Sequence, residues 1–305
     1  MMKDFLCLSD WSLTALEEIF ALTKKLKDRQ KNGEPHRLLD GKTLGMIFEK
    51  SSTRTRVSFE VGMYQLGGHA LFLHSGTTQL GRGEPIKDTA RVMARYCDGI
   101  MIRTYSQAGI EELAHWSDVP VINGLTDMYH PCQIMADLFT VIEHRGNYRD
   151  LSYCWIGDGN NMANSWINAA ALFGFELRVA TPQGYEPDAE VIARAQKQGV
   201  KLLLTNDPRE AADGADVLNT DVWASMGQED EQQAREKAFA DFQINAALVK
   251  QAAADCVVMH CLPAHRNEEI TDDVIEGPHS IIFDEAENRL HVQKAIMATL
   301  MGPNV

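Results

Sequence analysis

Several features that mark other protein classes are missing from this sequence. No stretch approaches the ~18 consecutive apolar residues of a membrane span, and the first residues lack the apolar core of a signal peptide. The six cysteines are too few for a disulfide-stapled scaffold, and no two of them are spaced as CxxC. No internal repeat or low-complexity tract is present. We therefore expect a globular cytoplasmic protein whose cysteines are free thiols.

Positive charge is also scarce. The 305 residues include 29 Lys and Arg against 43 Asp and Glu, which gives a formal net charge of −14. An acidic surface repels nucleic acids and anionic membranes, so neither is expected as the main partner. A small anionic substrate is not excluded, because a local cluster of arginines can hold an anion whatever the distant surface carries. At about 150 residues per domain, the length predicts two domains.

Short apolar runs alternate with helical patterns along nearly the whole chain. This alternation predicts two α/β domains, each a doubly wound parallel sheet, with an interdomain cleft. We expect domains at 1–145 and 146–286, with the C-terminal segment 287–305 returning to pack on the first. A first helix should begin near the capping residues Ser9-Asp10. Strands are expected at 43–48, 69–74, 99–104, 120–125, 152–157, 176–181, 200–205, 216–220, 256–261 and 280–284, and helices at 86–96, 109–117, 131–144, 162–173, 188–198, 231–240 and 287–301.

The loops after the strands are the candidate sites, because open α/β sheets bind ligands beyond the carboxyl ends of their strands. The strand 43–48 leads into Ser52-Thr53-Arg54-Thr55 at a helix start. Free backbone N–H groups there attract anions, and hydroxyl and guanidinium groups add donors. We favour phosphate binding over a plain helix cap. Arg103, at the end of 99–104, either meets a buried carboxylate or faces a ligand.

The strand 120–125 is followed by His130-Pro131-Cys132-Gln133. Proline suits the first turn of a helix, and His130 and Gln133, three residues apart, can both project from that turn. Imidazole and carboxamide groups together could donate to a carbonyl-type oxygen. The alternative is an ordinary helix start.

The second half of the chain offers polar groups at comparable positions. After 152–157, the turn GDGNN lacks the third glycine of a dinucleotide-binding loop, so Asn161 either binds a polar ligand or caps a helix. After 216–220, Asp221, Ser225 and Met226 lie in a loop that could equally be a surface connection. Both segments therefore leave a binding and a structural interpretation open.

The strand 256–261 ends in the sequence HCLP, and Arg289 follows at the start of the last helix. A core cysteine is the usual role for a residue such as Cys261. His260 and Cys261 lack zinc-like spacing, and adjacent strand residues should point to opposite faces. A Cys/His hydrolase stays open, because such partners are distant in sequence.

Together these motifs resemble those of the aspartate/ornithine carbamoyltransferase family, over essentially the whole chain. STRT at 52–55 and HPCQ at 130–133 are similar to motifs of transcarbamoylases in general. Asp221 with Ser225-Met226-Gly227, and HCLP at 260–263, are similar to motifs of the ornithine branch. The resemblance implies transfer of the carbamoyl group of carbamoyl phosphate to the δ-amine of L-ornithine. The products would be L-citrulline and phosphate, and no metal or organic cofactor would be required.

The resemblance also implies a role for each motif, with carbamoyl phosphate on the first domain and ornithine on the second. It implies trimers, or assemblies of trimers, with sites at subunit interfaces, and we favour the biosynthetic direction of arginine metabolism. The residues implied as catalytic are Arg54, Arg103, His130, Asp221 and Cys261. Those implied for carbamoyl phosphate are Ser52, Thr53, Arg54, Thr55, Arg103, His130, Pro131, Cys132, Gln133, Cys261, Leu262 and Arg289, with Gln79 reaching a neighbouring subunit's ligand, and those for ornithine are Asn161, Asp221, Ser225 and Met226.

Three other functions compete with this one. A related transcarbamoylase could use another amine, such as putrescine or an acylated ornithine. A transcarbamoylase-like domain could act only as a binding partner or regulator, although the intact motifs count against it. A nucleotide-dependent oxidoreductase would rest on the GDGNN turn alone.

Overall fold

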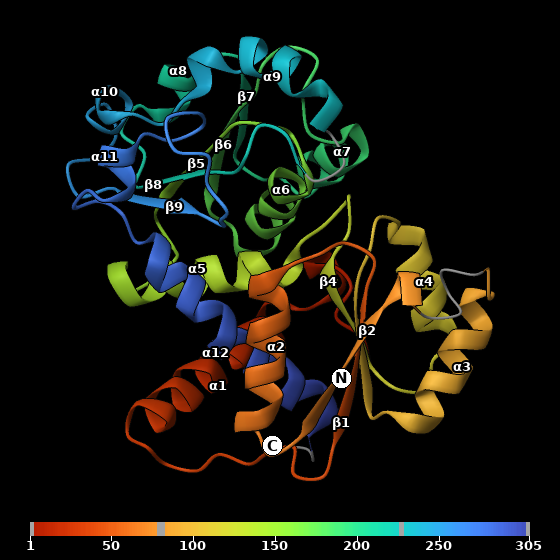
Figure 1. Ribbon diagram of the computed structural model, residues 1–305. Helices are drawn as coiled ribbons and strands as arrows, with labels where there is room; N and C mark the ends of the chain where they lie inside the picture. Colours follow the sequence, from red (N-terminus) through yellow and green to blue (C-terminus); the bar gives the residue numbers. More distant parts are fainter. Residues whose placement is uncertain (1–2, 78–82, 226–228, 303–305) are drawn as a thin grey trace. The chain divides into compact units, whose positions relative to one another are not determined.

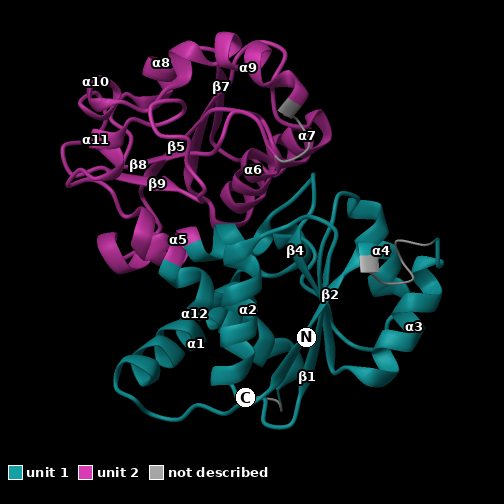
Figure 2. Cartoon of the chain, in the orientation of Figure 1, with its two compact units in different colours: residues 1–136, 287–305 teal, residues 137–286 magenta. Residues whose placement is uncertain are grey.

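A computed structural model describes residues 3–77, 83–225 and 229–302 of the chain. Contacts divide it into two compact units, residues 1–136 with 287–305, and residues 137–286 (Figure 2). The chain passes between the units inside helix α5 (Pro131–Arg145) and again inside helix α12 (Ile282–Met301). The division therefore falls within α5, ahead of the expected boundary at residue 145.

Within its described residues, the first unit contains a parallel sheet with strand order β2-β1-β3-β4 (Figure 1). The central strands are buried, as expected for a sheet covered by helices on both faces, whereas β2 forms an exposed edge. The elements are α1 (Leu13–Lys31), β1 (Thr43–Phe48), α2 (Thr53–Gln65), β2 (His69–His74), α3 (Ile86–Tyr96), β3 (Gly99–Arg103), α4 (Gln107–Trp116) and β4 (Val121–Leu125).

Within its described residues, the second unit contains a parallel sheet with strand order β7-β6-β5-β8-β9. Its core gathers apolar side chains from the strands and from the segments that follow β8 and β9. The elements are β5 (Ser152–Ile156), α6 (Asn161–Phe173), β6 (Glu176–Ala180), α7 (Ala189–Lys197), β7 (Leu202–Thr205), α8 (Pro208–Ala212), β8 (Val217–Thr220), α9 (Gln232–Ala238), α10 (Ala246–Val249), β9 (Val257–His260) and α11 (Asp272–Ile275).

The predicted fold class, two α/β domains with parallel sheets, is confirmed. Nine of the predicted strands form within one or two residues of the expected ends. The interdomain cleft stays a prediction. All six cysteines are free thiols. In the part of the chain that the structure describes, no helix combines the length and apolarity needed to cross a membrane.

The predicted start of the first helix is a few residues too early, and one predicted strand is wrong. The first long helix is capped by Ser12, whose hydroxyl accepts the Ala15 N–H at 3.2 Å, because Ser9-Asp10 belong to a short 3₁₀ turn. The expected strand 280–284 does not form either. Ser280 makes only an isolated bridge to Val258, and α12 begins at Ile282 instead of at residue 287. Acidic side chains in its first turn favour that helix start.

Candidate functional site

The first group of predicted residues lies where the order of the first sheet reverses. Strands β1 and β3 are neighbours, Phe48 pairs with Arg103 at their carboxyl ends, and the chain leaves them toward opposite edges of the sheet. Such a reversal opens a crevice for ligands beyond the strand ends. Helix α2 begins directly after β1, and its cap Ser52 accepts the Thr55 N–H at 3.2 Å. Arg103 and the first turn of α2, which includes Thr53 and Arg54, thus both lie beyond the carboxyl ends of β1 and β3, where such sheets usually bind ligands.

Arg289 joins three separate segments of this unit. Its guanidinium donates to Thr55 Oγ1 at 3.1 Å and to Gln133 Oε1, so α12 is tied to the first turns of both α2 and α5. Only 3% of Arg289 is exposed. A buried guanidinium beside a helix N-terminus makes this place electropositive, which suits a phosphate or a developing oxyanion.

His130 and Cys132 have different roles at the start of α5. Burial, followed by the charges of Arg289 and Arg103, holds the pKa of His130 well below its usual value, so its imidazole is neutral. Pro131 and Cys132 are buried in the first turn of α5. The Cys132 thiol donates to the Asn123 carbonyl at 3.4 Å, and burial raises its pKa to about 12. Its contact with β4 marks Cys132 as a core residue of this unit.

In the second unit, Asp221 lies where the strand order of the sheet reverses, beyond the carboxyl ends of the strands. The sheet order reverses between β5 and β8, and Asp221 directly follows β8. Its Oδ2 accepts from Asn160 Nδ2 at 3.1 Å, and its Oδ1 accepts from the Cys261 thiol at 3.1 Å. The loops after β5, β8 and β9 therefore meet at one carboxylate.

Cys261 is a protonated thiol in this setting. Burial raises its pKa well above the usual value, and the carboxylates of Asp221 and Glu285 raise it further. A thiolate nucleophile needs the opposite environment, with cationic neighbours. The Cys/His hydrolase interpretation is therefore disfavoured, and Cys261 acts as a hydrogen-bond donor. Leu262 follows it with φ 57°, in the left-handed region.

The remaining predicted residues are placed as follows. Asn161 is the first residue of α6, half-buried, and its carbonyl accepts from the Ser165 hydroxyl at 2.6 Å. Ser225 is half-buried in the loop after β8. Gln79 and Met226 lie outside the described residues.

The motifs do not reveal the partners of two residues near Asp221, namely Asn160 and Arg235. Asn160, next to the predicted Asn161, caps α6 and also donates to Asp221. Asp158 pairs with Arg235 at 3.1 Å, and both side chains are almost fully buried. Arg235 also donates to the Trp223 carbonyl at 2.9 Å and pairs with Glu231 at 3.0 Å. Arg235 thus contacts Trp223, which precedes Ser225 in the sequence, and Glu231, which follows it.

The sequence predicts that the side chains of His260 and Cys261 point to opposite faces of the strand. That prediction is wrong, because their potential metal-ligand atoms lie close together. Asp221, His260 and Cys261 offer possible metal ligands within 4.8 Å of one another. These atoms are engaged inside the protein, because the thiol donates to Asp221 and His260 Nδ1 accepts the Leu262 N–H. We assign the group to hydrogen bonding.

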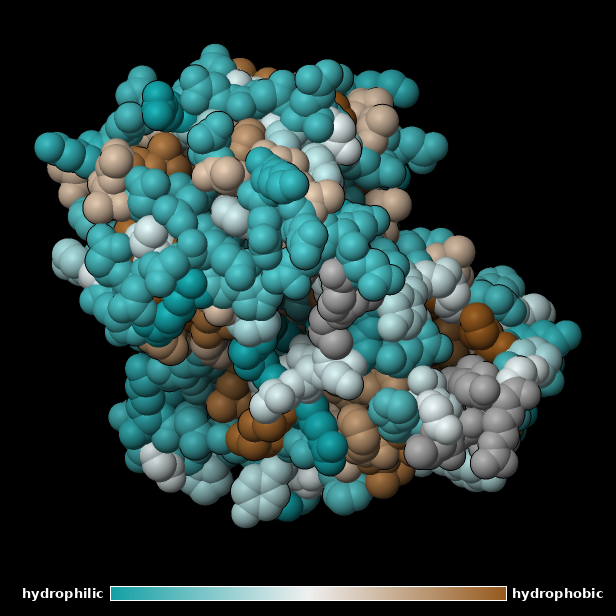
Figure 3. Space-filling model, turned by 45° about the horizontal axis from the view of Figure 1, so that its top comes forward, coloured by the Kyte–Doolittle hydropathy of each residue, from teal (hydrophilic) through white to brown (hydrophobic). Residues whose placement is uncertain are grey.

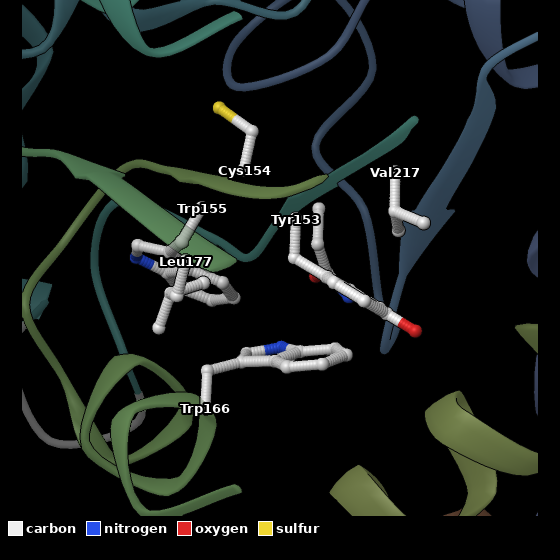
Figure 4. A pocket seen from close by; sticks show the side chains of 7 residues that line it. Tyr153, Cys154, Trp155, Trp166, Leu177 and Val217 are labelled. Carbon is white, nitrogen blue, oxygen red and sulfur yellow. The ribbon is translucent and has the colours of Figure 1, made fainter. Parts of the chain in front are cut away.

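A narrow cavity, too small to hold a water molecule, lies elsewhere in the second unit, within its core (Figure 4). Tyr153 and Trp155 of β5 point toward it and Cys154 points away, as alternation along a strand requires. The rings of Tyr153 and Trp166 lie 5.4 Å apart. None of the predicted site residues lines this cavity, which is enclosed mainly by apolar side chains, so it is not the candidate site.

Comparison with known proteins identifies the family of the chain. The carbamoyl-P binding domain of aspartate/ornithine carbamoyltransferases matches residues 3–143, and their Asp/Orn binding domain matches residues 149–300. The chain belongs to the aspartate/ornithine carbamoyltransferase family. The first match ends at residue 143, within α5, and the second begins at residue 149, ahead of β5.

Individual members of the family match over almost their whole length. The ornithine carbamoyltransferase of Syntrophotalea carbinolica is 74% identical, over 99% of this chain and 100% of the relative. That of Geobacter metallireducens is 64% identical over the same shares. Among solved structures, the ornithine carbamoyltransferase from Pyrococcus furiosus is 53% identical with a TM-score of 0.94, covering 98% of this chain and 97% of that one.

Proposed function

We propose that each place described above binds one substrate of a carbamoyl transfer. The activity is that of an ornithine carbamoyltransferase: the carbamoyl group of carbamoyl phosphate passes to the δ-amine of L-ornithine, giving L-citrulline and phosphate. The assignment of residues to the two substrates rests on one observation, the reversal of strand order in each of the two sheets. One collects cationic and N–H donors, and the other collects a carboxylate with amide and thiol groups.

Carbamoyl phosphate suits the first unit. The N-terminal turn of α2, with Ser52, Thr53, Arg54 and Thr55, supplies N–H, hydroxyl and guanidinium donors to the phosphate, and Arg103 adds a second guanidinium. His130 and Gln133 lie at the start of α5, where they can contact the carbamoyl oxygen and amide. A neutral imidazole still donates one hydrogen bond, so His130 can stabilise the oxyanion without titrating.

Ornithine suits the second unit. The carboxylate of Asp221 complements an ammonium group, and Asn161 and Ser225, with Met226, would complete the contacts to the amino acid. The attacking amine must lose a proton, since a free amine near pKa 10 is mostly charged at neutral pH. Cys261 cannot accept that proton as a thiolate, because its raised pKa keeps it protonated. The departing phosphate is therefore the proposed acceptor. Contacts of Cys261 and Leu262 with carbamoyl phosphate stay a prediction.

We further propose a homotrimer, or an assembly of trimers, acting in the cytoplasm in arginine biosynthesis. Apolar side chains interrupt the hydrophilic surface in the view of Figure 3. Among the described residues, five exposed large apolar side chains belong to the edge strand β2 and to α2. An exposed sheet edge with apolar neighbours favours association with another chain. The five side chains, which we call the β2–α2 patch, are Val57, Val61, Tyr64, Leu71 and Phe72.

One assay tests the proposed substrates. The purified protein is incubated with carbamoyl phosphate and, in parallel, with ornithine, putrescine, N-acetylornithine or aspartate. Citrulline should form with ornithine, and the other amines should give no ureido product. Transfer to putrescine or N-acetylornithine instead would establish the rival amine, and no product with any amine would refute carbamoyl transfer altogether.

A further inference from the structure

Two buried carboxylates hold the turn that follows β9. Glu285, in the first turn of α12, accepts the backbone N–H of His260 at 2.9 Å. Glu269 accepts from His260 Nε2, also at 2.9 Å, and the side chains of both partners are 0% exposed. Neither carboxylate belongs to the motifs that predicted the site. His260 itself precedes Cys261, which donates to Asp221.

The hydrogen bonds of His260 define its tautomer. Nδ1 lies 2.9 Å from the backbone nitrogen of Leu262, which can only donate, so Nδ1 must be the unprotonated acceptor. The ring is therefore neutral, with its proton on Nε2. An ionised carboxylate can only accept hydrogen bonds. Glu269 Oε1 accepts one from His260 Nε2–H and a second from the His265 N–H at 2.7 Å. Glu269 thereby favours the tautomer that Leu262 requires.

That tautomer matters because the turn is strained. Leu262 has φ 57°, a conformation that branched side chains rarely adopt unless the surroundings hold them there. The hydrogen bond from its N–H to His260 is a direct restraint on this backbone. With Nδ1 protonated, the bond would become a repulsion between two donors, and the turn would lose its restraint next to Cys261.

We infer that Glu269 is a positioning residue for carbamoyl transfer. It fixes His260 as the Nε2–H tautomer, so that the Cys261-Leu262 turn keeps its shape and Cys261 stays against Asp221. The inference rests on the proposed function, in which Cys261 and Leu262 contact carbamoyl phosphate and the turn adjoins the ornithine site through the hydrogen bond of Cys261 to Asp221. Glu269 touches no substrate, and its effect reaches the reaction only through His260.

The principal test removes the acceptor. Glu269→Leu should lower kcat by about 10-fold to 10²-fold and raise the KM for ornithine, because a displaced turn misplaces the reacting groups. The KM for carbamoyl phosphate should rise less than the KM for ornithine, because most of the proposed contacts of carbamoyl phosphate belong to the first unit. The matched control is Glu268→Leu, whose carboxylate pairs with His265 at 3.4 Å and should leave kinetics near normal.

Rescue separates positioning from general loss of structure. Asn has a side-chain carbonyl near the place of Nδ1, so His260→Asn supplies an acceptor to the Leu262 N–H that needs no partner at Glu269. Adding His260→Asn to Glu269→Leu should recover part of the lost kcat. A double variant no better than Glu269→Leu, or a Glu269→Leu variant as active as the control, would overturn the inference.

A spectroscopic readout does not depend on activity. Spectra of ¹⁵N-histidine-labelled protein should show His260 protonated on Nε2 in the wild type and at least partly on Nδ1 in Glu269→Leu. Should that variant not fold, Glu269→Gln keeps a carbonyl acceptor and should retain both the tautomer and most of the activity. A wild type with His260 protonated on Nδ1 contradicts the inference even if citrulline forms. A wild type with the Nε2–H tautomer but no citrulline refutes the proposed function alone.

Discussion

At the scale of single residues, the candidate site depends on groups whose charge is set by their surroundings. His130 is held neutral beside two arginines, and Cys261 is held protonated beside two carboxylates. Both therefore act as hydrogen-bond donors at neutral pH, and neither supplies charge. Among the residues predicted to bind phosphate, the positive charge comes from Arg54, Arg103 and Arg289.

Arg54 gives the clearest residue-scale prediction. Arg54→Ala should reduce kcat/KM by about 10²–10³, the usual effect of removing one donor to a developing anion. Circular dichroism and thermal melting should show an unchanged fold, because Arg54 is only half-buried. The matched control is Arg37→Ala, an exposed arginine paired with Asp40. Activity close to wild type in Arg54→Ala would refute the phosphate assignment.

Residue identities near strand ends could be predicted from the sequence, but their partners could not. STRT, Arg103 and Asp221 stand out because helix starts and strand ends attract particular side chains. Glu269 and Arg235 carry no such local signal. Their importance comes from contacts with His260 and Asp158, and the latter is far away in sequence. Asn160 could have been found, since it occupies the cap position directly before a predicted helix.

Lys294 gives a prediction about pH. It is fully buried, donates to Gln65 at 2.8 Å, and burial lowers its pKa from 10.5 to about 8. Between these values the unfolded chain binds the extra proton, so the free energy of unfolding should rise as pH increases from about 8 to 10.5.

Lys294→Met removes this dependence. The stability of the variant relative to wild type should be greatest below pH 8 and should decrease by about 1.4 kcal/mol per pH unit above it. Urea denaturation of both proteins at pH 7 and pH 10 measures the difference. A difference that is equal at the two pH values would contradict a lowered pKa.

At the scale of elements, periodicity predicted the strands well because parallel strands are short, buried and apolar. The segment 280–284 was wrongly predicted as a strand because Ile281 and Ile282 are buried at the start of α12, although Phe283 beside them is exposed. Periodicity cannot distinguish these cases in so short a run. The start of α1 was placed too early because Ser9, Asp10 and Ser12 are all good caps.

The loop between β8 and α9 gives the element-scale prediction. Arg235 contacts Trp223 and Glu231 on its two sides and pairs with Asp158. Arg235→Gln should therefore raise the KM for ornithine about tenfold, corresponding to ~1.4 kcal/mol, with little change in the KM for carbamoyl phosphate. Steady-state kinetics with each substrate varied in turn measures both. Arg209→Gln, on α8, is the control. Equal rises in both constants would argue against a local effect on this loop.

At the scale of the whole molecule, both units have a parallel sheet whose strand order reverses once. In the proposed function, the side chains near each reversal bind one substrate. The net charge of −14 hides this arrangement, because it averages a cationic place in one unit with an acidic surface elsewhere. The net charge argues against nucleic acid as a partner but carries no information about the site.

Assembly gives the molecule-scale prediction. Phe72→Asp places a charge in the β2–α2 patch and should shift the mass measured by light scattering from a trimer toward a monomer, with a loss of activity. The matched control is Leu203→Asp. Leu203 is equally exposed, at 36%, but lies on β7 in the other sheet. A Phe72→Asp protein that keeps the mass of the wild type would remove the patch from the proposed interface.

The most direct test of the central claim uses one ligand that carries both substrate ends, a phosphonoacetyl group joined by an amide to the δ-nitrogen of ornithine. Calorimetry measures its affinity for the wild type, Arg54→Ala and Asp221→Asn. If the two units each bind one substrate of the same reaction, both variants should weaken binding at least about tenfold, or ~1.4 kcal/mol each. Wild-type affinity in either variant would contradict the account.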